Sequence, residues 1–154
     1  MKPDSRLSSV LHVLLHMAEN PLPVTSEVMA QHMQTNPVVV RRTMAGLRKA
    51  GLVEAAKGPG GGWRLTCALA ETTLHDVYRA LGEPALFSFG NRNPQPRCLV
   101  EQAVNASIDE ARQAAEAQLL ARLTEVTLAD IAADFQTRLR HHPHHNHPSH
   151  PHEL

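Results

Sequence analysis

The chain has 154 residues, enough for one compact domain and an appendage. Apolar residues make up 42% of it but aromatic residues only 3%, which favours a helical core of Leu, Val, Ala and Met. No apolar stretch approaches membrane-spanning length and the start lacks the apolar core of a signal peptide, so we expect a cytoplasmic protein with no membrane partner. Cys67 and Cys98 are too few for a disulfide framework or a zinc site made by protein ligands alone.

The formal net charge of zero hides an asymmetry between the two halves of the chain. Residues 1–66 contain eight Lys and Arg against four acidic residues, a net charge of +4. The remaining residues contain seven against eleven, a net charge of −4. A basic first half favours a nucleic-acid module, joined here to a module for assembly or sensing.

Two helices are predicted before residue 36. Apolar residues at helical spacing indicate the first over residues 7–18. The second opens with Thr25 or Ser26 as N-cap and ends near Gln34. We expect this second helix to bury Val28 and either His32 or Met33.

A third helix is predicted from Pro37 to about residue 50, with Asn36 as N-cap and Gly51 as its C-terminal stop. One face is apolar, and every charge on the opposite face is positive. The apolar face holds Val40, Met44 and Leu47; the outward face holds Val38, Arg41, Arg42, Ala45, Arg48 and Lys49.

Residues 25–50 therefore provide a short helix, a tight turn and a second helix, the parts of a helix-turn-helix whose second helix enters the DNA major groove. A solvated basic face would explain the charges if this helix stood alone. Arg can read guanine, and a methyl group can touch thymine. The candidates for base contact are Asn36, Val38, Val39, Arg41 and Arg42, those for phosphate contact are Arg48 and Lys49, and Thr35 in the turn is a further DNA-contact candidate.

Residues 52–57 and 63–67 predict two strands joined by a turn of four glycines and one proline. Such a hairpin behind a basic helix is typical of a winged helix, although the glycines alone would also fit a floppy connection. Lys57 and Arg64 flank the turn, where a cation can enter the adjacent minor groove. Gly60 and Gly61 allow close approach to DNA, and Trp63 is expected to pack against the recognition helix.

The rest of the chain is predicted to be helical, apart from a loop at residues 85–97. Thr73 and Asp76 resemble a capping box, and Thr127 is expected to cap a last helix. Between them a long helix begins at Cys98. Its apolar stripe comprises Val100, Val104, Ile108, Ala111, Ala115, Leu119, Leu123 and Val126. We expect this stripe to pair with a second copy of the chain; the alternative is that it folds back on its own core.

Residues 139–154 form a His-rich tail that is expected to be disordered because it cannot pack a core. Closely spaced imidazoles can gather transition metals, so the tail is either a metal site or a solubilising segment. The candidate metal ligands are His141, His142, His144, His145 and His147.

The segment from Asn36 to Leu65, with its Gly-Pro-Gly-Gly-Gly turn, resembles the Rrf2 family of bacterial winged-helix regulators. The resemblance covers residues 5–135 and includes the long helix from Cys98. It implies a homodimer whose long helices cross, with two recognition helices and two wings on a palindromic operator, and in most members repression of transcription. Lys57 would touch DNA from the wing and Arg41 would read bases. The implied division is a DNA-binding domain (1–84), a sensor-type loop (85–97), dimerisation and closing helices (98–138) and the tail (139–154).

Relatives that bind an iron–sulfur cluster carry three cysteines before the dimerisation helix, whereas this chain has only Cys98 there. We therefore expect no cluster and no resident cofactor, with a transition metal on the tail as the one exception. Cys98, at a helix N-terminus beside Arg97, is a candidate redox sensor; an ordinary packing role is equally compatible with its position.

The prediction is a mainly helical winged-helix transcriptional regulator that binds duplex DNA as a homodimer. No catalytic constellation is visible, since His12, His16, His32 and His75 are scattered over the predicted helices, so we do not expect an enzyme. Two alternatives stay open: a metal-handling protein or metal-responsive regulator acting through the His-rich tail, and a winged helix used for protein contacts.

Overall fold

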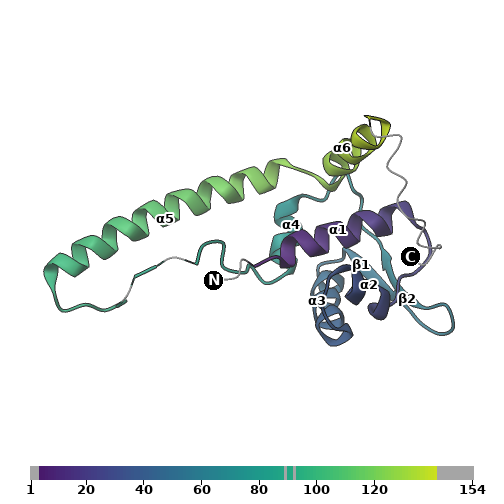
Figure 1. Ribbon diagram of the computed structural model, residues 1–154, viewed down its shortest axis with the longest axis horizontal. Helices are drawn as coiled ribbons and strands as arrows, with labels where there is room; N and C mark the ends of the chain where they lie inside the picture. Colours follow the sequence, from purple (N-terminus) through teal and green to yellow (C-terminus); the bar gives the residue numbers. More distant parts are fainter. Residues whose placement is uncertain (1–3, 89, 92, 142–154) are drawn as a thin grey trace.

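The computed structural model describes residues 4–88, 90–91 and 93–141. A winged helix lies at one end of the molecule, and one long helix projects from it (Figure 1). The elements in chain order are α1 (Arg6–Glu19), α2 (Ser26–His32), α3 (Pro37–Lys49), β1 (Val53–Ala56), β2 (Gly62–Leu65), α4 (Leu74–Ala80), α5 (Leu99–Glu125) and α6 (Leu128–His141).

Local capping signals set the limits of α2 and α3. The side chain of Thr25 accepts a hydrogen bond from the backbone N–H of Val28 (3.3 Å), and that of Asn36 accepts one from Val39 (3.0 Å). Gly51 ends α3 with φ +77°, a conformation that L side chains disfavour. These helix boundaries confirm the predicted helix-turn-helix.

The core lies between α1, α2 and α3. Val40, Met44 and Leu47 of α3 are buried, as predicted from their spacing. The prediction for α2 holds in part: Val28 and Met33 pack, partly buried, against the core, whereas His32 is exposed. The fully buried residues of this helix, Met29 and Ala30, were not predicted. A helix of seven residues carries too short a pattern to define its buried face, so packing against α3 decides it.

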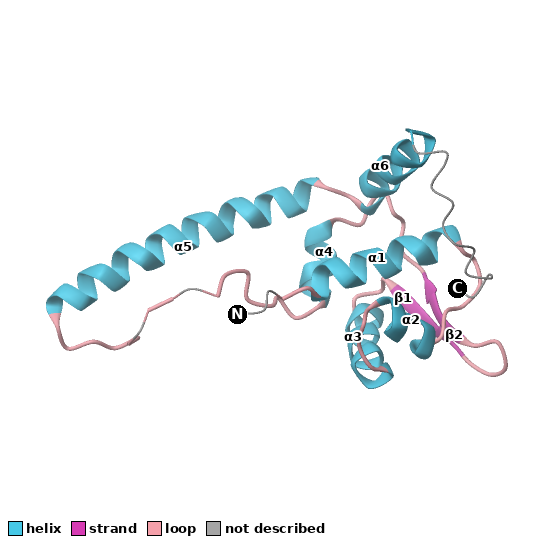
Figure 2. Ribbon diagram, in the orientation of Figure 1, coloured by secondary structure: helices cyan, strands magenta, loops and turns pink. Residues whose placement is uncertain are grey.

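The wing is an antiparallel hairpin (Figure 2). Relative to the prediction, β1 is one residue shorter at each end, whereas β2 begins one residue earlier, at Gly62, and ends two residues earlier, at Leu65. Its register pairs Ala55 with Trp63 and Ala56 with Gly62. Val24, just before α2, adds a bridge to Trp63 through two backbone hydrogen bonds of 2.7 and 2.9 Å. The wing is therefore fixed to the helix-turn-helix through the chain segment that enters α2.

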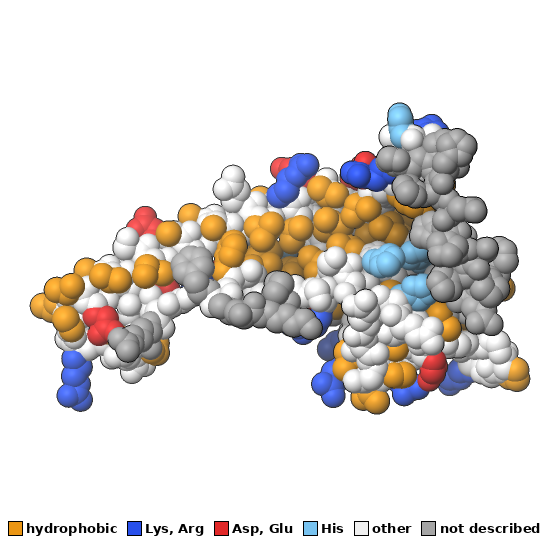
Figure 3. All heavy atoms as spheres, viewed as in Figure 1, with side chains coloured by type: hydrophobic (Ala, Val, Ile, Leu, Met, Phe, Trp, Pro, Cys, Tyr) orange, Lys and Arg blue, Asp and Glu red, His pale blue; other side chains and the backbone are white. Residues whose placement is uncertain are grey.

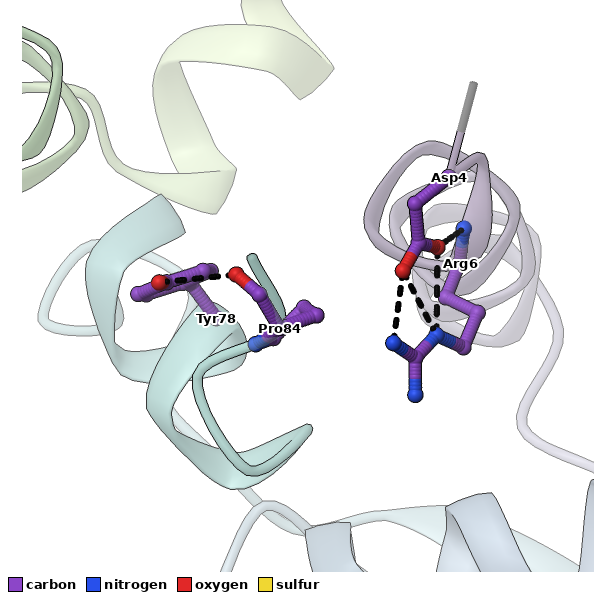
Figure 4. A network of polar contacts seen from close by, with 4 residues as sticks. All are labelled: Asp4, Arg6, Tyr78 and Pro84. Carbon is purple, nitrogen blue, oxygen red and sulfur yellow. Dashed lines mark hydrogen bonds and ion pairs between the residues drawn. The ribbon is translucent and has the colours of Figure 1, made fainter. Parts of the chain in front are cut away.

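Two local contacts fix the ends of α1 and α4 (Figure 4). Asp4 accepts hydrogen bonds from the backbone N–H of Arg6 (3.0 Å) and from its guanidinium (2.6 Å) at the start of α1. The phenol of Tyr78 donates to the carbonyl oxygen of Pro84 (3.0 Å) and thereby fixes the turn after α4. The predicted capping box at the start of α4 is present, with Thr73 and Asp76 each accepting a hydrogen bond from the other's backbone N–H.

The long helix α5 contacts α4 but buries none of its own residues. Its exposed apolar side chains include Leu99 (78% exposed) and Val104 (50%). An orange band of hydrophobic side chains follows this part of the surface (Figure 3). Within the described chain, then, the alternative that this stripe folds back on its own core does not hold.

The last helix, α6, returns to the winged helix. Leu128 at its start is fully buried in the core, and Thr127 forms a bridge with Thr73. Thr127 also caps α6, because its hydroxyl oxygen accepts a hydrogen bond from the backbone N–H of Asp130 (3.1 Å). In return, the backbone N–H and hydroxyl of Thr127 donate to the carboxylate of Asp130 and lower its pKa. The boundary expected for the tail at residue 139 is too early, since α6 continues to His141. In the described part of the chain, no helix is both long and apolar enough to cross a bilayer.

Candidate nucleic-acid interface

The outward face of α3 presents two apolar side chains followed by cations. Val38 and Val39 in the first turn are exposed, as are Arg41 and Arg42. Arg48 and Lys49 lie in the last turn, where positive charge also suits the helix dipole. Basic side chains extend along the edge of the molecule that holds α3 and the wing (Figure 3). The face can therefore meet both base edges and phosphates.

Arg41 is held by an acidic residue of the preceding helix. Its Nη2 lies 2.7 Å from Oε1 of Glu27 in α2, and both side chains are more than half exposed. Arg42, Arg48 and Lys49 take part in no ion pair among the described residues. This pair was not predicted, because Arg41 and Glu27 are 14 positions apart in the sequence.

The turn of the wing depends on its glycines. Gly58 and Gly60 have φ of +84° and +73°. A Cβ on Gly61 would lie 2.4 Å from the carbonyl oxygen of Ala56, so only glycine fits there. The turn therefore has a defined backbone rather than the floppy connection that glycines alone would allow.

The predicted cations of the wing differ in their surroundings. Arg64 faces Glu54 across the hairpin, with Nη1 and Oε1 3.8 Å apart. Lys57 at the base of the turn is exposed and has no ion pair among the described residues. It is therefore the wing cation more available to a phosphate or a minor groove.

Trp63, which was expected to pack against α3, joins the wing to α2. Its indole Nε1–H donates to Oγ of Ser26 (3.0 Å), and Ser26 is itself buried. The reason is the bridge to Val24, which places the ring over the start of α2. Wing and helix-turn-helix are thus connected by both backbone and side chain.

Two of the predicted contact residues have structural roles in the turn. Asn36 uses its side-chain oxygen as the N-cap of α3, and Thr35 is half-buried, with its backbone N–H donating to the carbonyl of Ala30 (2.9 Å). The turn also holds Gln34 at φ +51°, where glycine would be less strained. Asn36 is exposed, so the NH2 group of its side chain remains accessible to a ligand.

Cys98 is exposed at the N-cap position of α5. Its side chain makes no full capping hydrogen bond, but the backbone N–H groups of Glu101 and Val100 lie close enough to lower the pKa of the thiol. Cys67, in contrast, is half-buried against the core of the winged helix.

The loop before Cys98 offers amides rather than thiols. Nδ2 of Asn91 donates to Asp109 of α5 (3.0 Å), and Asn105 donates to the carbonyl of Asn93 (2.7 Å). A cluster that needs mostly thiolate ligands does not fit this donor set. No three His, Cys, Asp or Glu side chains among the described residues are already arranged around a metal position.

Of the predicted metal ligands in the tail, only His141 is described. It ends α6, with Nδ1 2.7 Å from the carbonyl oxygen of Thr137. His142, His144, His145 and His147 lie outside the described residues.

The chain is similar to known regulators over most of its length. A family model, Rrf2, described as an iron-dependent transcriptional regulator, matches residues 4–134. YwnA of Bacillus subtilis (strain 168), which bears the name of an HTH-type transcriptional regulator, is 31% identical over 130 residues, or 83% of this chain and 95% of YwnA. The HTH-type transcriptional regulator IscR of Vibrio cholerae serotype O1 is 36% identical over 77 residues, or 50% of this chain and 43% of IscR. The chain thus matches less than half the length of IscR.

A comparison with solved structures also finds a transcriptional regulator. A protein from Lactobacillus plantarum, described as a transcriptional regulator, superposes with a TM-score of 0.70 at 25% identity, covering 90% of this chain and 97% of that protein. These matches give no support to a metal-handling protein. The exposed cationic helix, the glycine-defined wing and the match over residues 4–134 together place the chain in the Rrf2 family of transcriptional regulators.

Proposed function

We propose that the protein acts by binding rather than by catalysis, as a homodimeric repressor on a palindromic DNA operator. Each protomer inserts α3 into a major groove and places the wing against the adjacent minor groove. Val38, Val39, Arg41 and Arg42 read bases, and the remaining cations contact phosphates.

The observation that carries this proposal is the connection between the two cationic elements. The α3 face and the wing that carries Lys57 are parts of one unit, because Trp63 and Val24 tie the hairpin to α2. A duplex can therefore meet both elements with little loss of conformational entropy on binding.

The exposed apolar stripe on α5 supports the proposal that the protein is a dimer. A helix of 27 residues with no buried side chain leaves apolar surface in water, and burying one Val or Leu contributes about 1.5–3 kcal/mol. A second copy of α5 supplies a matching apolar surface, and a two-fold dimer positions two α3 helices for two half-sites.

Selection of bound fragments from the source genome, followed by fluorescence anisotropy with the selected duplex, tests the proposal. Affinity should fall by roughly 10³–10⁵-fold between about 50 and about 200 mM salt if 6–10 phosphates are contacted. Weak binding that prefers no sequence and changes little with salt would instead indicate a winged helix used for protein contacts.

Cys98 is the candidate sensor within this proposal, and we infer that no iron–sulfur cluster takes part. The exposed thiol with its lowered pKa suits oxidation by peroxide. A Cys98→Ser variant should keep its DNA affinity and lose peroxide-dependent release. Release that persists in this variant rules out the sensor, and iron–sulfur absorption in anaerobically purified protein contradicts the cluster-free state.

A further inference from the structure

Three histidines that are far apart in sequence meet on one surface of the winged helix. His12 and His16 lie one turn apart on α1, and His32 is the last residue of α2. All three side chains are exposed. Pale-blue histidine side chains are visible beside α1 in Figure 3. We call His12, His16 and His32 the histidine cluster.

The rings of the cluster form a compact triangle. Nε2 of His12 and Nε2 of His16 are 2.8 Å apart, so one of these nitrogens donates a hydrogen bond and the other accepts it. The ring centres are 4.6 Å apart for His12 and His16, 6.0 Å for His16 and His32, and 6.4 Å for His12 and His32.

These separations are close to those of a three-histidine metal site. Metal–nitrogen bonds of about 2.0–2.1 Å to a tetrahedral ion place ring centres about 5 Å apart, so the two longer separations have to close by only about 1 Å. As they stand, the three rings are not arranged to hold an ion, and neither is any other group of such side chains among the described residues, so at least one ring has to rotate before an ion can bind. Because χ2 of histidine is soft and His32 is exposed at a helix end, rotation of its side chain can close the triangle.

The floor of the cluster is apolar. His16 and His32 line a small pocket together with Val13, Met17 and Met29. Both methionines are buried, so protein lies on the inner side of the cluster. The apolar inner wall strengthens the attraction between a bound ion and its ligands, and three histidines leave the fourth position of a tetrahedral ion to water or another ligand.

We propose that His12, His16 and His32 bind one borderline transition-metal ion, of the class Zn²⁺, Ni²⁺ or Cu²⁺. Neutral imidazole suits these ions, and two histidines spaced by four on a helix present their nitrogens on one face. The bound ion links α1 to α2, the first helix of the helix-turn-helix. This site is separate from the tail and from the loop before α5.

The test has to remove the tail as a competing chelator. In the full-length chain, the seven histidines of residues 141–152 are replaced by Asn, and Co²⁺ is titrated as a probe with visible absorption. We expect one equivalent to bind with the intense absorption of a tetrahedral ion, and Zn²⁺ to displace it.

Further substitutions in that background identify the ligands. His32→Asn and His12→Asn should each weaken Co²⁺ binding by more than the roughly 10–100-fold that follows loss of a supporting hydrogen bond. His75→Asn, on α4, is the matched control and should bind like the parent. Both cluster positions are exposed, so folding, checked by circular dichroism, should be retained.

Two results overturn the proposal: no Co²⁺ absorption from the tail-substituted protein, or full absorption from the His32→Asn variant. Neither result depends on DNA binding, so the metal-site proposal can be disproved without affecting the proposal that the protein is a DNA-binding regulator.

Discussion

Arg41 is placed both to contact DNA and to pair with an acidic side chain of the neighbouring helix. It is a candidate for base contact on α3, and it is paired with Glu27 of α2. An exposed ion pair contributes only about 0–1 kcal/mol, so DNA can take the guanidinium from Glu27 at small cost. Glu27 meanwhile keeps the guanidinium beside the first turns of α3, and so reduces the freedom lost on binding.

Replacing Arg41 by Ala should therefore weaken binding to the selected operator by about 1–3 kcal/mol and relax base preference at one position of each half-site. Anisotropy with the operator and single-base variants measures both effects. Arg138→Ala removes an exposed, ion-paired cation from α6 and serves as the control. Equal losses in the two variants would mean that Arg41 contributes only charge.

Lys57 differs from Arg41 in having no ion pair among the described residues. Lys57→Ala should weaken binding to all duplexes about equally and reduce the slope of log affinity against log salt by about 1 per protomer. The same anisotropy titrations at several salt concentrations test this expectation. A change of base preference without a change of slope would contradict a phosphate contact.

Cys98 should react as a thiolate at lower pH than an ordinary cysteine. The N–H groups of Glu101 and Val100 lower the pKa of its thiol, so the ionised form persists as pH falls toward neutrality. Iodoacetamide labelling followed by mass spectrometry across pH 6–9, a range chosen around the usual thiol pKa of about 8.5, should show labelling at Cys98 before Cys67. Faster labelling of Cys67 would contradict this order.

At the scale of elements, the contact between α3 and α4 depends on Gly46. A Cβ there would lie 2.7 Å from the carbonyl oxygen of Ala80, closer than real Cβ contacts allow. In an open helix, alanine would be favoured over glycine by about 1 kcal/mol. Here the backbone of α4 would have to move, and the clash outweighs the gain in helix propensity.

Gly46→Ala should accordingly lower the free energy of unfolding by about 1–3 kcal/mol, measured by urea denaturation. Ala45→Gly, at the exposed neighbouring position, is the matched control and should cost only about 1 kcal/mol through helix propensity. A Gly46→Ala protein as stable as the parent would show that α3 and α4 are not packed this closely.

The elements also differ in how far sequence alone determines them. The first and last residues of α3 and the capping box of α4 were predicted correctly. A cap residue and the helix residue that it contacts are only a few positions apart, so such contacts depend mainly on the local sequence. The buried face of α2 was predicted only in part, because seven residues allow several faces and packing against α3 selects the one centred on Met29 and Ala30.

For the whole molecule, the unburied stripe of α5 is the feature that requires a partner. If two copies pair through it, a charge in the stripe should separate them. Val104→Asp should shift the protein from dimer to monomer in sedimentation velocity, because an ionised carboxylate cannot be buried without a partner. Gln113→Asp, on the opposite side of α5, should remain dimeric.

A Val104→Asp protein that stays dimeric would place the interface elsewhere. A monomer that also loses its DNA affinity, while circular dichroism remains unchanged, would support an operator read by two protomers together.

The sequence by itself determined the helix-turn-helix, the wing with its glycine turn, and a long helix with one apolar stripe. These features depend on caps, on periodicity and on residues that allow positive φ, all of which act over a few neighbouring positions. The sequence also indicated which cations form the candidate DNA-binding site, since those of α3 and the wing were identified from charge and spacing.

Only the tertiary structure decided how distant residues meet. It pairs Arg41 with Glu27, places Trp63 on Ser26, buries Leu128 in the core and gathers histidines that sequence analysis described as scattered. Each contact joins segments whose relative orientation depends on packing of the whole core. No local pattern contains that orientation, which is why these contacts could not be predicted.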